Sequence, residues 1–183
     1  MKTALVIVDM LEDFVDGVLA NPAALGIIAP IAALAEEARR RDDWVVIYAN
    51  DAHKDGDLEF DVFGVHAVDG SDGAAVVQAL QPQPGDIVVP KRFYSAFTQT
   101  DLEATCRVHD IGRMVIVGQH TNCCCRHTAY DAYVRGIEVV AVSDATCVFQ
   151  PLFPDNYDQG QQDALDYLAT IYKAKIVDSA SVF

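Results

Sequence analysis

Six short apolar runs, rich in β-branched residues, recur along the chain and are separated by stretches with helical patterns. The runs cover 4–9, 44–49, 86–90, 113–118, 137–142 and 174–178. The predicted helices cover 22–40, 73–80, 101–110, 122–135 and 157–173. Apolar strands that alternate with helices are typical of a parallel sheet that helices cover on each side. The sequence therefore predicts an α/β fold with three α/β/α layers around a six-stranded, mainly parallel, Rossmann-like sheet.

The chain shows no internal repeat, low-complexity tract or linker, and its 183 residues are enough for one buried core. We therefore expect a single domain over 1–183. One irregular segment, 50–72, is longer than the loops that usually connect elements in a compact domain. Loops of that length usually carry function.

The formal net charge is −14, from 13 basic and 27 acidic residues. A surface of this sign repels nucleic acids and anionic membranes, so we expect neither as a partner. No apolar run approaches the ~20 residues that span a bilayer, and Asp9 interrupts the first run too early for a secretory signal. Five cysteines, an odd number, favour free thiols over a disulfide framework. We expect a cytoplasmic protein.

Ionisable side chains directly follow four of the predicted strands. Asp9 ends the first strand, Asp51 and His53 follow the second, Lys91 follows the third, and the cysteines of 123–125 follow the fourth. Ligands of open parallel sheets bind beyond the carboxyl ends of the strands. The sequence therefore predicts a functional site at this edge of the sheet.

Three adjacent cysteines, Cys123, Cys124 and Cys125, stand at the start of a predicted helix. A helix N-terminus stabilises a thiolate, which is the nucleophilic form of the side chain. Successive helical positions differ by about 100°, so only one of the three faces the sheet edge. Zinc sites space their cysteines two to four residues apart, which adjacent cysteines do not match. Asp9 could take the thiol proton while Lys91 stabilises the thiolate. These features alone do not select one cysteine.

The segment 50–72 and the strand before it contain a second group of chemistry-bearing residues, with two imidazoles and two carboxylates. The members of this four-ligand group are Asp51, His53, Glu59 and His66. A mixed set of nitrogen and oxygen ligands suits Zn, Fe or Mn better than Ca. Taken alone, the pattern favours ordinary loop contacts, with a divalent metal site as the alternative.

Three segments resemble the isochorismatase-like cysteine hydrolases and, within them, the nicotinamidases: "IVDMLEDF", "PKRFYSAFTQTDL" and "GQHTNCCCRHTAYDA". The resemblance extends over nearly the whole chain. It implies the isochorismatase-like fold and a catalytic triad of Asp9, Lys91 and Cys124. It also implies a mechanism in which the aspartate takes the thiol proton, the thiolate attacks an amide carbonyl, ammonia leaves, and water hydrolyses the thioester.

The resemblance also assigns roles around the triad. The backbone N–H groups of His120 and Cys124 correspond to the family's oxyanion hole. The family's cis peptide maps onto Gln119–His120. The four-ligand group corresponds to a metal site, with Zn as the first choice and Fe or Mn as alternatives, whose ion binds a pyridine nitrogen and orients the ring.

Several further side chains are candidates for contact with the substrate. Phe14, Phe63 and Tyr94 could enclose a flat molecule, although core packing is an equal alternative for each. Gln119 and His120 are polar where the family has small or aliphatic residues, and we assign them to substrate binding as well. A histidine beside the oxyanion hole leaves the identity of the substrate open.

Three functional hypotheses follow. The leading one is a nicotinamidase, a hydrolase of carbon–nitrogen bonds in linear amides, because the four-ligand group matches that family. The second is an amidase of N-carbamoyl or ureido compounds, resembling N-carbamoylsarcosine amidase, which Gln119 and His120 favour. The third is a noncatalytic thiol sensor or metal-binding module that uses 123–125. The resemblance also implies a small-molecule amide as ligand and a homo-oligomer.

Overall fold

A parallel sheet of six strands forms the centre of the structure, a computed structural model that describes all 183 residues. The strands are β1 (Lys2–Val8), β2 (Trp44–Asp51), β3 (Ile87–Lys91), β4 (Ile111–Gln119), β5 (Glu138–Cys147) and β6 (Lys175–Val177). Their order in the sheet is β3-β2-β1-β4-β5-β6, and every neighbouring pair is parallel. The six predicted strands are confirmed, and the sheet is wholly rather than mainly parallel.

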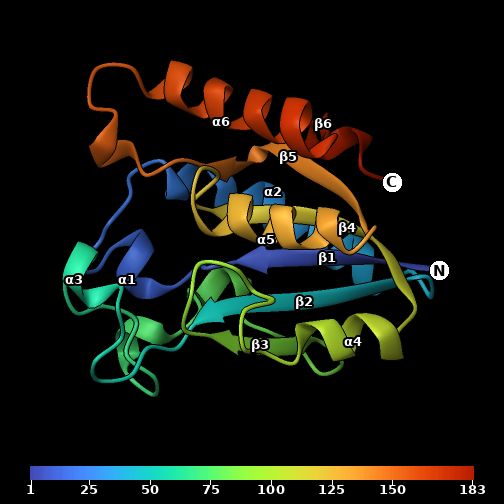
Figure 1. The fold of residues 1–183 in the computed structure, drawn as a ribbon, viewed down its shortest axis with the longest axis horizontal. Coiled ribbons are helices and arrows are strands. Elements are labelled where there is room, and N and C mark those ends of the chain that lie inside the picture. Colours follow the sequence, from blue (N-terminus) through green and yellow to red (C-terminus); the bar gives the residue numbers. More distant parts are fainter.

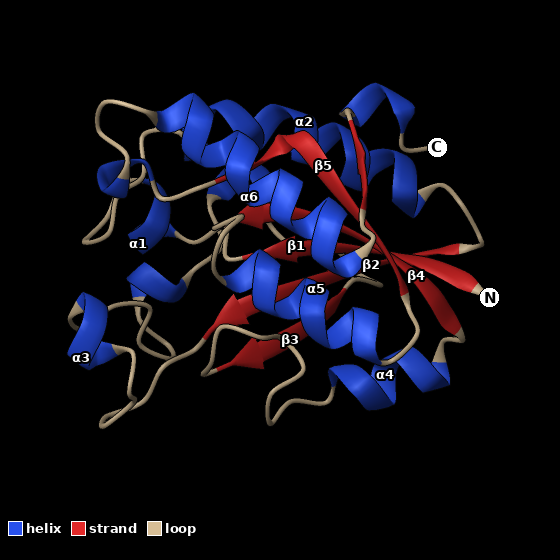
Figure 2. Cartoon of the chain, turned by 45° about the horizontal axis from the view of Figure 1, so that its top comes forward, coloured by secondary structure: helices blue, strands red, loops and turns tan.

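Helices cover both faces of the sheet (Figures 1 and 2). They are α1 (Glu12–Val15), α2 (Ala24–Arg39), α3 (Phe60–Phe63), α4 (Leu102–Val108), α5 (Cys124–Val134) and α6 (Tyr157–Tyr172). Helix α2 packs on one face, and α4, α5 and α6 pack on the other. Because successive side chains of a strand point to opposite faces, β1 contributes Leu5 to the first core and Val6 to the second. The predicted three-layer α/β/α fold is confirmed. No helix is both long enough and apolar enough to cross a membrane.

Strand β1 lies in the middle of the sheet, and its residues from Ala4 to Val8 are fully buried. From β1 the chain builds outward to β3 on one side, then returns to β4 and builds outward to β6 on the other. Ligands of open α/β sheets bind beyond the strand ends at the place where the order reverses. The short helices α1 and α3 lie beyond this carboxyl end of the sheet (Figure 1).

One predicted helix is wrong. Residues 73–80 form two 3-10 turns, Asp72–Ala74 and Gln78–Leu80, and no α-helix. The backbone between these turns is bound to the chain that follows β1, where the Val77 N–H donates to the Met10 carbonyl at 3.0 Å. That long-range bond replaces the local bonds that a helix would need, so tertiary pairing overrides the local pattern.

Other elements differ from the prediction in extent. Strand β5 continues to Cys147 instead of ending at 142, because a shift in its register with β4 lets Thr146 and Cys147 pair opposite Gly118 and Gln119. Helices α1 and α3 were not predicted, since four residues are too few to show a helical period.

Gly118 permits the close approach of β4 to β1. Its φ is +102°, and a Cβ at this position would lie 2.1 Å from the Val8 carbonyl oxygen. We expect Gly118→Ala to lower the free energy of unfolding by about 3 kcal/mol or more. The positive φ is strained for alanine, and the added Cβ would collide with backbone atoms of Val8, which cannot move aside as a side chain can. Gly26→Ala, in the exposed first turn of α2 with no atom within 4 Å of the added Cβ, should be neutral or stabilising by up to ~1 kcal/mol. Urea unfolding measures both, and equal stability of the two variants would contradict this account.

Candidate active site

A buried cation between two carboxylates lies at the carboxyl ends of β1, β2 and β3. Lys91 Nζ lies 2.8 Å from Asp9 Oδ2 and 2.5 Å from Asp51 Oδ1. The Asp51 backbone N–H also donates to Asp9 Oδ1 at 2.8 Å. All three side chains are almost completely excluded from solvent. Asp9, Asp51 and Lys91 therefore lie together at the carboxyl edge of the sheet, where the rule for strand ends placed them.

Burial and mutual attraction set the charge states of this cluster. Burial, with a further contribution from Asp51, raises the pKa of Asp9 to about 6, although Lys91 opposes the rise. Burial also acts to raise the pKa of Asp51, but Lys91 and His53 outweigh it and the net pKa is lowered. Burial acts to lower the pKa of Lys91, but the two carboxylates raise it well above its usual value. Lys91 and Asp51 are therefore charged, and Asp9 is a proton acceptor near neutral pH.

Cys124 is the cysteine that meets this cluster. It is the first residue of α5, and its sulfur and the carboxylate oxygens of Asp9 and Asp51 lie within 4.8 Å of one another. Of its neighbours in sequence, Cys125 is buried in the core beneath α5, and Cys123 is half-buried. The structure thus brings together the three residues of the predicted triad.

The resting form of Cys124 differs from the expected thiolate. A hydrogen bond with the Cys123 side chain and burial raise the pKa of the Cys124 thiol well above its usual value, and the nearby Lys91 only partly opposes them. At neutral pH the nucleophile is therefore a thiol. A thiol needs a base beside it to become nucleophilic, and Asp9, within 4.8 Å of the sulfur and with a pKa of about 6, lies where such a base would act.

The turn between β4 and α5 leaves two backbone donors free beside Cys124. The N–H groups of Cys123 and Cys125 both donate to the His120 carbonyl, at 2.9 and 3.2 Å. The N–H groups of His120 and Cys124 donate to no acceptor in the protein. The peptide bond Gln119–His120 is cis, as the resemblance implied. Two free donors beside a nucleophile are the arrangement that stabilises a tetrahedral oxyanion.

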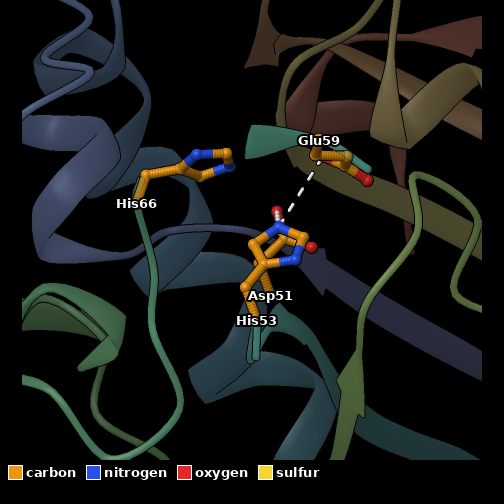
Figure 3. A group of neighbouring side chains, drawn as sticks. All are labelled: Asp51, His53, Glu59 and His66. Carbon is orange, nitrogen blue, oxygen red and sulfur yellow. Dashed lines mark ion pairs between the residues drawn. The ribbon is translucent and has the colours of Figure 1, made fainter. Parts of the chain in front are cut away.

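The four-ligand group converges next to the cluster (Figure 3). Its ligating atoms lie within 4.8 Å of one another, and all four side chains are buried. His53 Nε2 lies 3.7 Å from both Asp51 Oδ2 and Glu59 Oε2, and Figure 3 shows the His66 ring directed toward the other three residues from a separate stretch of loop. The predicted residues are therefore assembled from β2 and the segment that follows it.

The donor atoms of this group fit a divalent ion. His53 Nε2 and Glu59 Oε1 are buried and have no hydrogen-bond partner. His66 Nδ1 is hydrogen-bonded to the Gly64 carbonyl at 2.7 Å, which leaves its Nε2 for a ligand. Burial, with Asp51, raises the pKa of Glu59 to about 7, as expected for a carboxylate that lacks a cationic partner. The neighbouring group of Asp9, Asp51 and Cys124 is a poorer metal site because the Lys91 ammonium already contacts its carboxylates.

A pocket of about 190 Å³ opens beside Cys124, between the four-ligand group and the β4–α5 turn. Its walls are mainly apolar and aromatic, and none of them carries a lysine or arginine. The lining residues are Phe14, Leu19, Asp51, Glu59, Phe63, His66, Tyr94, His120, Asn122, Cys123, Cys124, Phe149 and Leu152. Of the predicted substrate contacts, Phe14, Phe63, Tyr94 and His120 therefore lie at the pocket.

Gln119 does not lie at the pocket, and the assignment of this residue to substrate binding is corrected. Its side chain is fully buried behind the turn, where Nε2 donates to the Asp9 carbonyl at 3.2 Å and Oε1 accepts from Asn21 Nδ2 at 3.1 Å. The physical reason is that Gln119 is the last residue of β4 and its side chain points into the protein, toward α1 and the segment after it. Gln119 therefore braces the strand end that carries the site.

Sequence reasoning missed the wall formed by Phe149 and Leu152, and the neighbour Asn122. The signal was available for Phe149: the strand-end rule applies to β5 too, but the strand was ended five residues early, at 142 instead of Cys147. Asp57, which holds His53 Nδ1 at 2.9 Å, was also missed. Nothing in the sequence separates Asp57 from the other acidic residues of its loop.

Comparisons with known proteins agree on one family. The model of the isochorismatase domain matches residues 3–180. N-carbamoylsarcosine amidase from Thermoplasma acidophilum superimposes with a TM-score of 0.89 at 34% identity, over 100% of this chain and 99% of that one. Nicotinamidase PncA from Bacillus subtilis gives 0.86 at 29% identity, over 97% and 100%. The pyrazinamidase of Pyrococcus horikoshii, in complex with zinc, gives 0.85 at 26% identity, over 97% and 99%.

The chain belongs to the isochorismatase domain family. The resemblance seen in the sequence is thereby confirmed. So is the broader prediction of a hydrolase that acts on carbon–nitrogen bonds, since the relatives with named activities are amidases. An enzyme is accordingly favoured over a noncatalytic thiol sensor or metal-binding module.

The buried cation should be essential to the fold. We expect Lys91→Met to lower the free energy of unfolding by about 3–5 kcal/mol, because it leaves two carboxylates buried without a counter-ion. Arg40→Gln is the control, since Arg40 pairs with Glu36 at the surface and exposed pairs contribute about 0–1 kcal/mol. Denaturant unfolding monitored by circular dichroism measures both. A loss below ~1 kcal/mol in Lys91→Met would show that the cluster does not depend on its cation.

Proposed function

We propose that the protein is a cysteine amidohydrolase of the nicotinamidase type, which converts nicotinamide and water to nicotinate and ammonia through a thioester. The observation that carries this proposal is the position of the Cys124 sulfur within 4.8 Å of the Asp9 carboxylate, beside a small aromatic pocket. Phe14, Tyr94 and Phe149 offer flat apolar surface to a ring. The pocket wall contains no lysine or arginine that would bind a negatively charged substrate.

The proposed mechanism uses groups that already lie close together. Asp9 takes the proton from the Cys124 thiol as the sulfur attacks the amide carbonyl carbon. The N–H groups of His120 and Cys124 hold the oxygen that becomes negative. Protonated Asp9 then gives its proton to the departing nitrogen, so that ammonia leaves and a thioester remains. Asp9 next takes a proton from the attacking water, and the thiol is restored when the acid leaves.

Lys91 has a positioning role in this scheme. It holds the carboxylates of Asp9 and Asp51 at fixed places and compensates their charge. Because Lys91 moderates the rise in the pKa of Asp9, that carboxyl group can both accept and donate a proton near neutral pH.

The four-ligand group is proposed to hold a divalent ion, with zinc as the first choice and iron or manganese as alternatives. Two imidazoles and two carboxylates suit each of these ions. The zinc complex of the Pyrococcus horikoshii relative supports the same choice. When bound, the ion would act as a Lewis acid for an electron-pair donor of the substrate such as a ring nitrogen.

A second candidate activity is the hydrolysis of an N-carbamoyl compound. The observation that favours it is a pair of polar atoms at the pocket, His120 Nε2 and Asn122 Oδ1, which are buried and have no hydrogen-bond partner. A ureido compound of the type R–NH–CO–NH2 carries an N–H next to its scissile carbonyl that nicotinamide lacks, and such a donor would satisfy Asn122. The similarity to N-carbamoylsarcosine amidase supports the same alternative.

Ammonia release separates the two candidates. We expect turnover of nicotinamide and pyrazinamide to exceed that of N-carbamoylsarcosine and ureidoacrylate, because the pocket offers aromatic surface and no lysine or arginine side chain for their carboxylates. The Cys124→Ala variant measures the background. A preference for the N-carbamoyl compounds would select the second candidate, and no activity above background on any of the four would contradict the proposed function.

The cysteine run should show one functional member. Cys124→Ala should lower kcat by at least about a thousandfold, as expected when a nucleophile is removed. Cys125→Ala should keep most activity, since its side chain lies in the core. Cys123→Ala should stay within about tenfold, because Cys123 lines the pocket but is not part of the group of Asp9, Asp51 and Cys124. Thermal unfolding checks that each variant is folded. An active Cys124→Ala together with an inactive Cys125→Ala would show that the wrong cysteine has been assigned.

A further inference from the structure

Four nitrogen atoms lie within hydrogen-bonding distance of the buried carboxylate of Asp57. Its Oδ2 lies 2.9 Å from His53 Nδ1 and accepts the Lys54 N–H at 3.0 Å. Arg92 Nε donates to both oxygens of Asp57, at 3.0 and 3.1 Å, and its Nη2 makes a further short contact. Asp57 is buried, whereas Arg92 is about half-exposed. The carboxylate therefore joins a histidine on one side to a guanidinium on the other.

This contact decides which nitrogen of His53 is free. A carboxylate at Nδ1 holds the proton on that nitrogen, so the lone pair is on Nε2. His53 Nε2 is the atom that faces Asp51 and Glu59 and that has no partner in the protein (Figure 3). The orientation and tautomer of His53 are thus fixed from the side opposite to the four-ligand group.

Arg92 directly follows Lys91 at the end of β3, and the two cations serve different members of the four-ligand group. Lys91 contacts Asp51 itself. Arg92 reaches His53 through Asp57. Two consecutive residues of one strand end therefore hold two of the four ligands, the first directly and the second through an intervening carboxylate.

We propose that Asp57 and Arg92 are positioning residues for the metal: Arg92 orients Asp57, and Asp57 presents His53 Nε2 to the ion. The proposal rests on the metal binding proposed above. A second reading of the same contacts is a purely structural one, in which the ion pair only attaches the loop after β2 to β3. The two differ in what they predict for metal affinity.

The chain offers a matched control for this distinction. Arg39 and Asp86 form another partly buried pair, in which Arg39 Nε lies 3.1 and 3.2 Å from the two oxygens of Asp86. Asp86 immediately precedes β3, so this pair braces the opposite end of the strand that Arg92 follows. Loss of Arg39 should therefore weaken the fold without touching the four-ligand group.

The test measures the affinity of the substrate-free protein for Zn²⁺ by competition with a chromogenic chelator, alongside the thermal midpoint of the metal-free protein. Asp57→Ala should weaken zinc binding by about 10- to 100-fold, the usual effect of losing a partner behind a ligating histidine. Asp57→Asn should lose less, because its amide oxygen still accepts from His53 Nδ1. Arg92→Gln should fall between wild type and Asp57→Ala, and Arg39→Gln should lower the thermal midpoint while zinc affinity stays at the wild-type value.

Three results would overturn the proposal. Zinc affinity within twofold of wild type in Asp57→Ala would show that His53 needs no such support. An equal loss in Arg39→Gln and Asp57→Ala would assign the effect to general loosening of the fold. Absence of zinc binding by the wild-type protein would remove the site that these residues are proposed to serve. The substrate screen is independent of all three, because amide hydrolysis by Cys124 is measured there directly.

Discussion

The burial of Lys91 is the constraint on which the rest of the site depends. An ammonium group removed from water is tolerated only when counter-charges and hydrogen bonds surround it, and here they come from Asp9 and Asp51. Lys91 and Asp51 are also direct neighbours in the register of β3 and β2, and the Asp51 N–H binds Asp9. The ends of three strands are therefore held together by one ion cluster, and the register of the sheet and the geometry of the site have the same cause.

Asp51 connects the two halves of the site. One of its oxygens binds Lys91, and the other faces His53 in the four-ligand group. A change in charge on either side is therefore felt by the other through a single buried carboxylate. Asp9 stands at the end of this chain of contacts, with its carboxylate within 4.8 Å of the Cys124 sulfur. The pKa values of both Asp9 and the Cys124 thiol are raised. In the proposed mechanism these shifts are complementary, because the sulfur keeps its proton at rest and Asp9 is unprotonated often enough near neutral pH to remove it.

The sequence predicted the parts of this arrangement that follow from periodicity and from strand ends. Buried parallel strands are continuous apolar runs, so all six could be recognised, and the rule for strand ends then selected Asp9, Asp51 and Lys91. The resemblance was needed to choose Cys124, because helix geometry only says that one cysteine faces inward. Contacts between distant segments could not be predicted. The 3-10 turns in 73–80 arise from long-range backbone pairing, and the inward direction of Gln119 depends on its packing against Asn21.

The division of labour between strands and loops explains how one fold can serve relatives with different substrates. Asp9 and Lys91 are themselves buried at the ends of β1 and β3, where the ion cluster leaves little freedom to change. Phe63, Phe149 and Leu152 come from the connecting segments beyond the strand ends and are at least partly exposed. Loop side chains can be replaced without disturbing the sheet, so the pocket wall can vary while the chemistry is retained. N-carbamoylsarcosine amidase and nicotinamidase share this fold at similar TM-scores, and it follows that substrate choice must be read from the pocket wall, not from the fold or the triad.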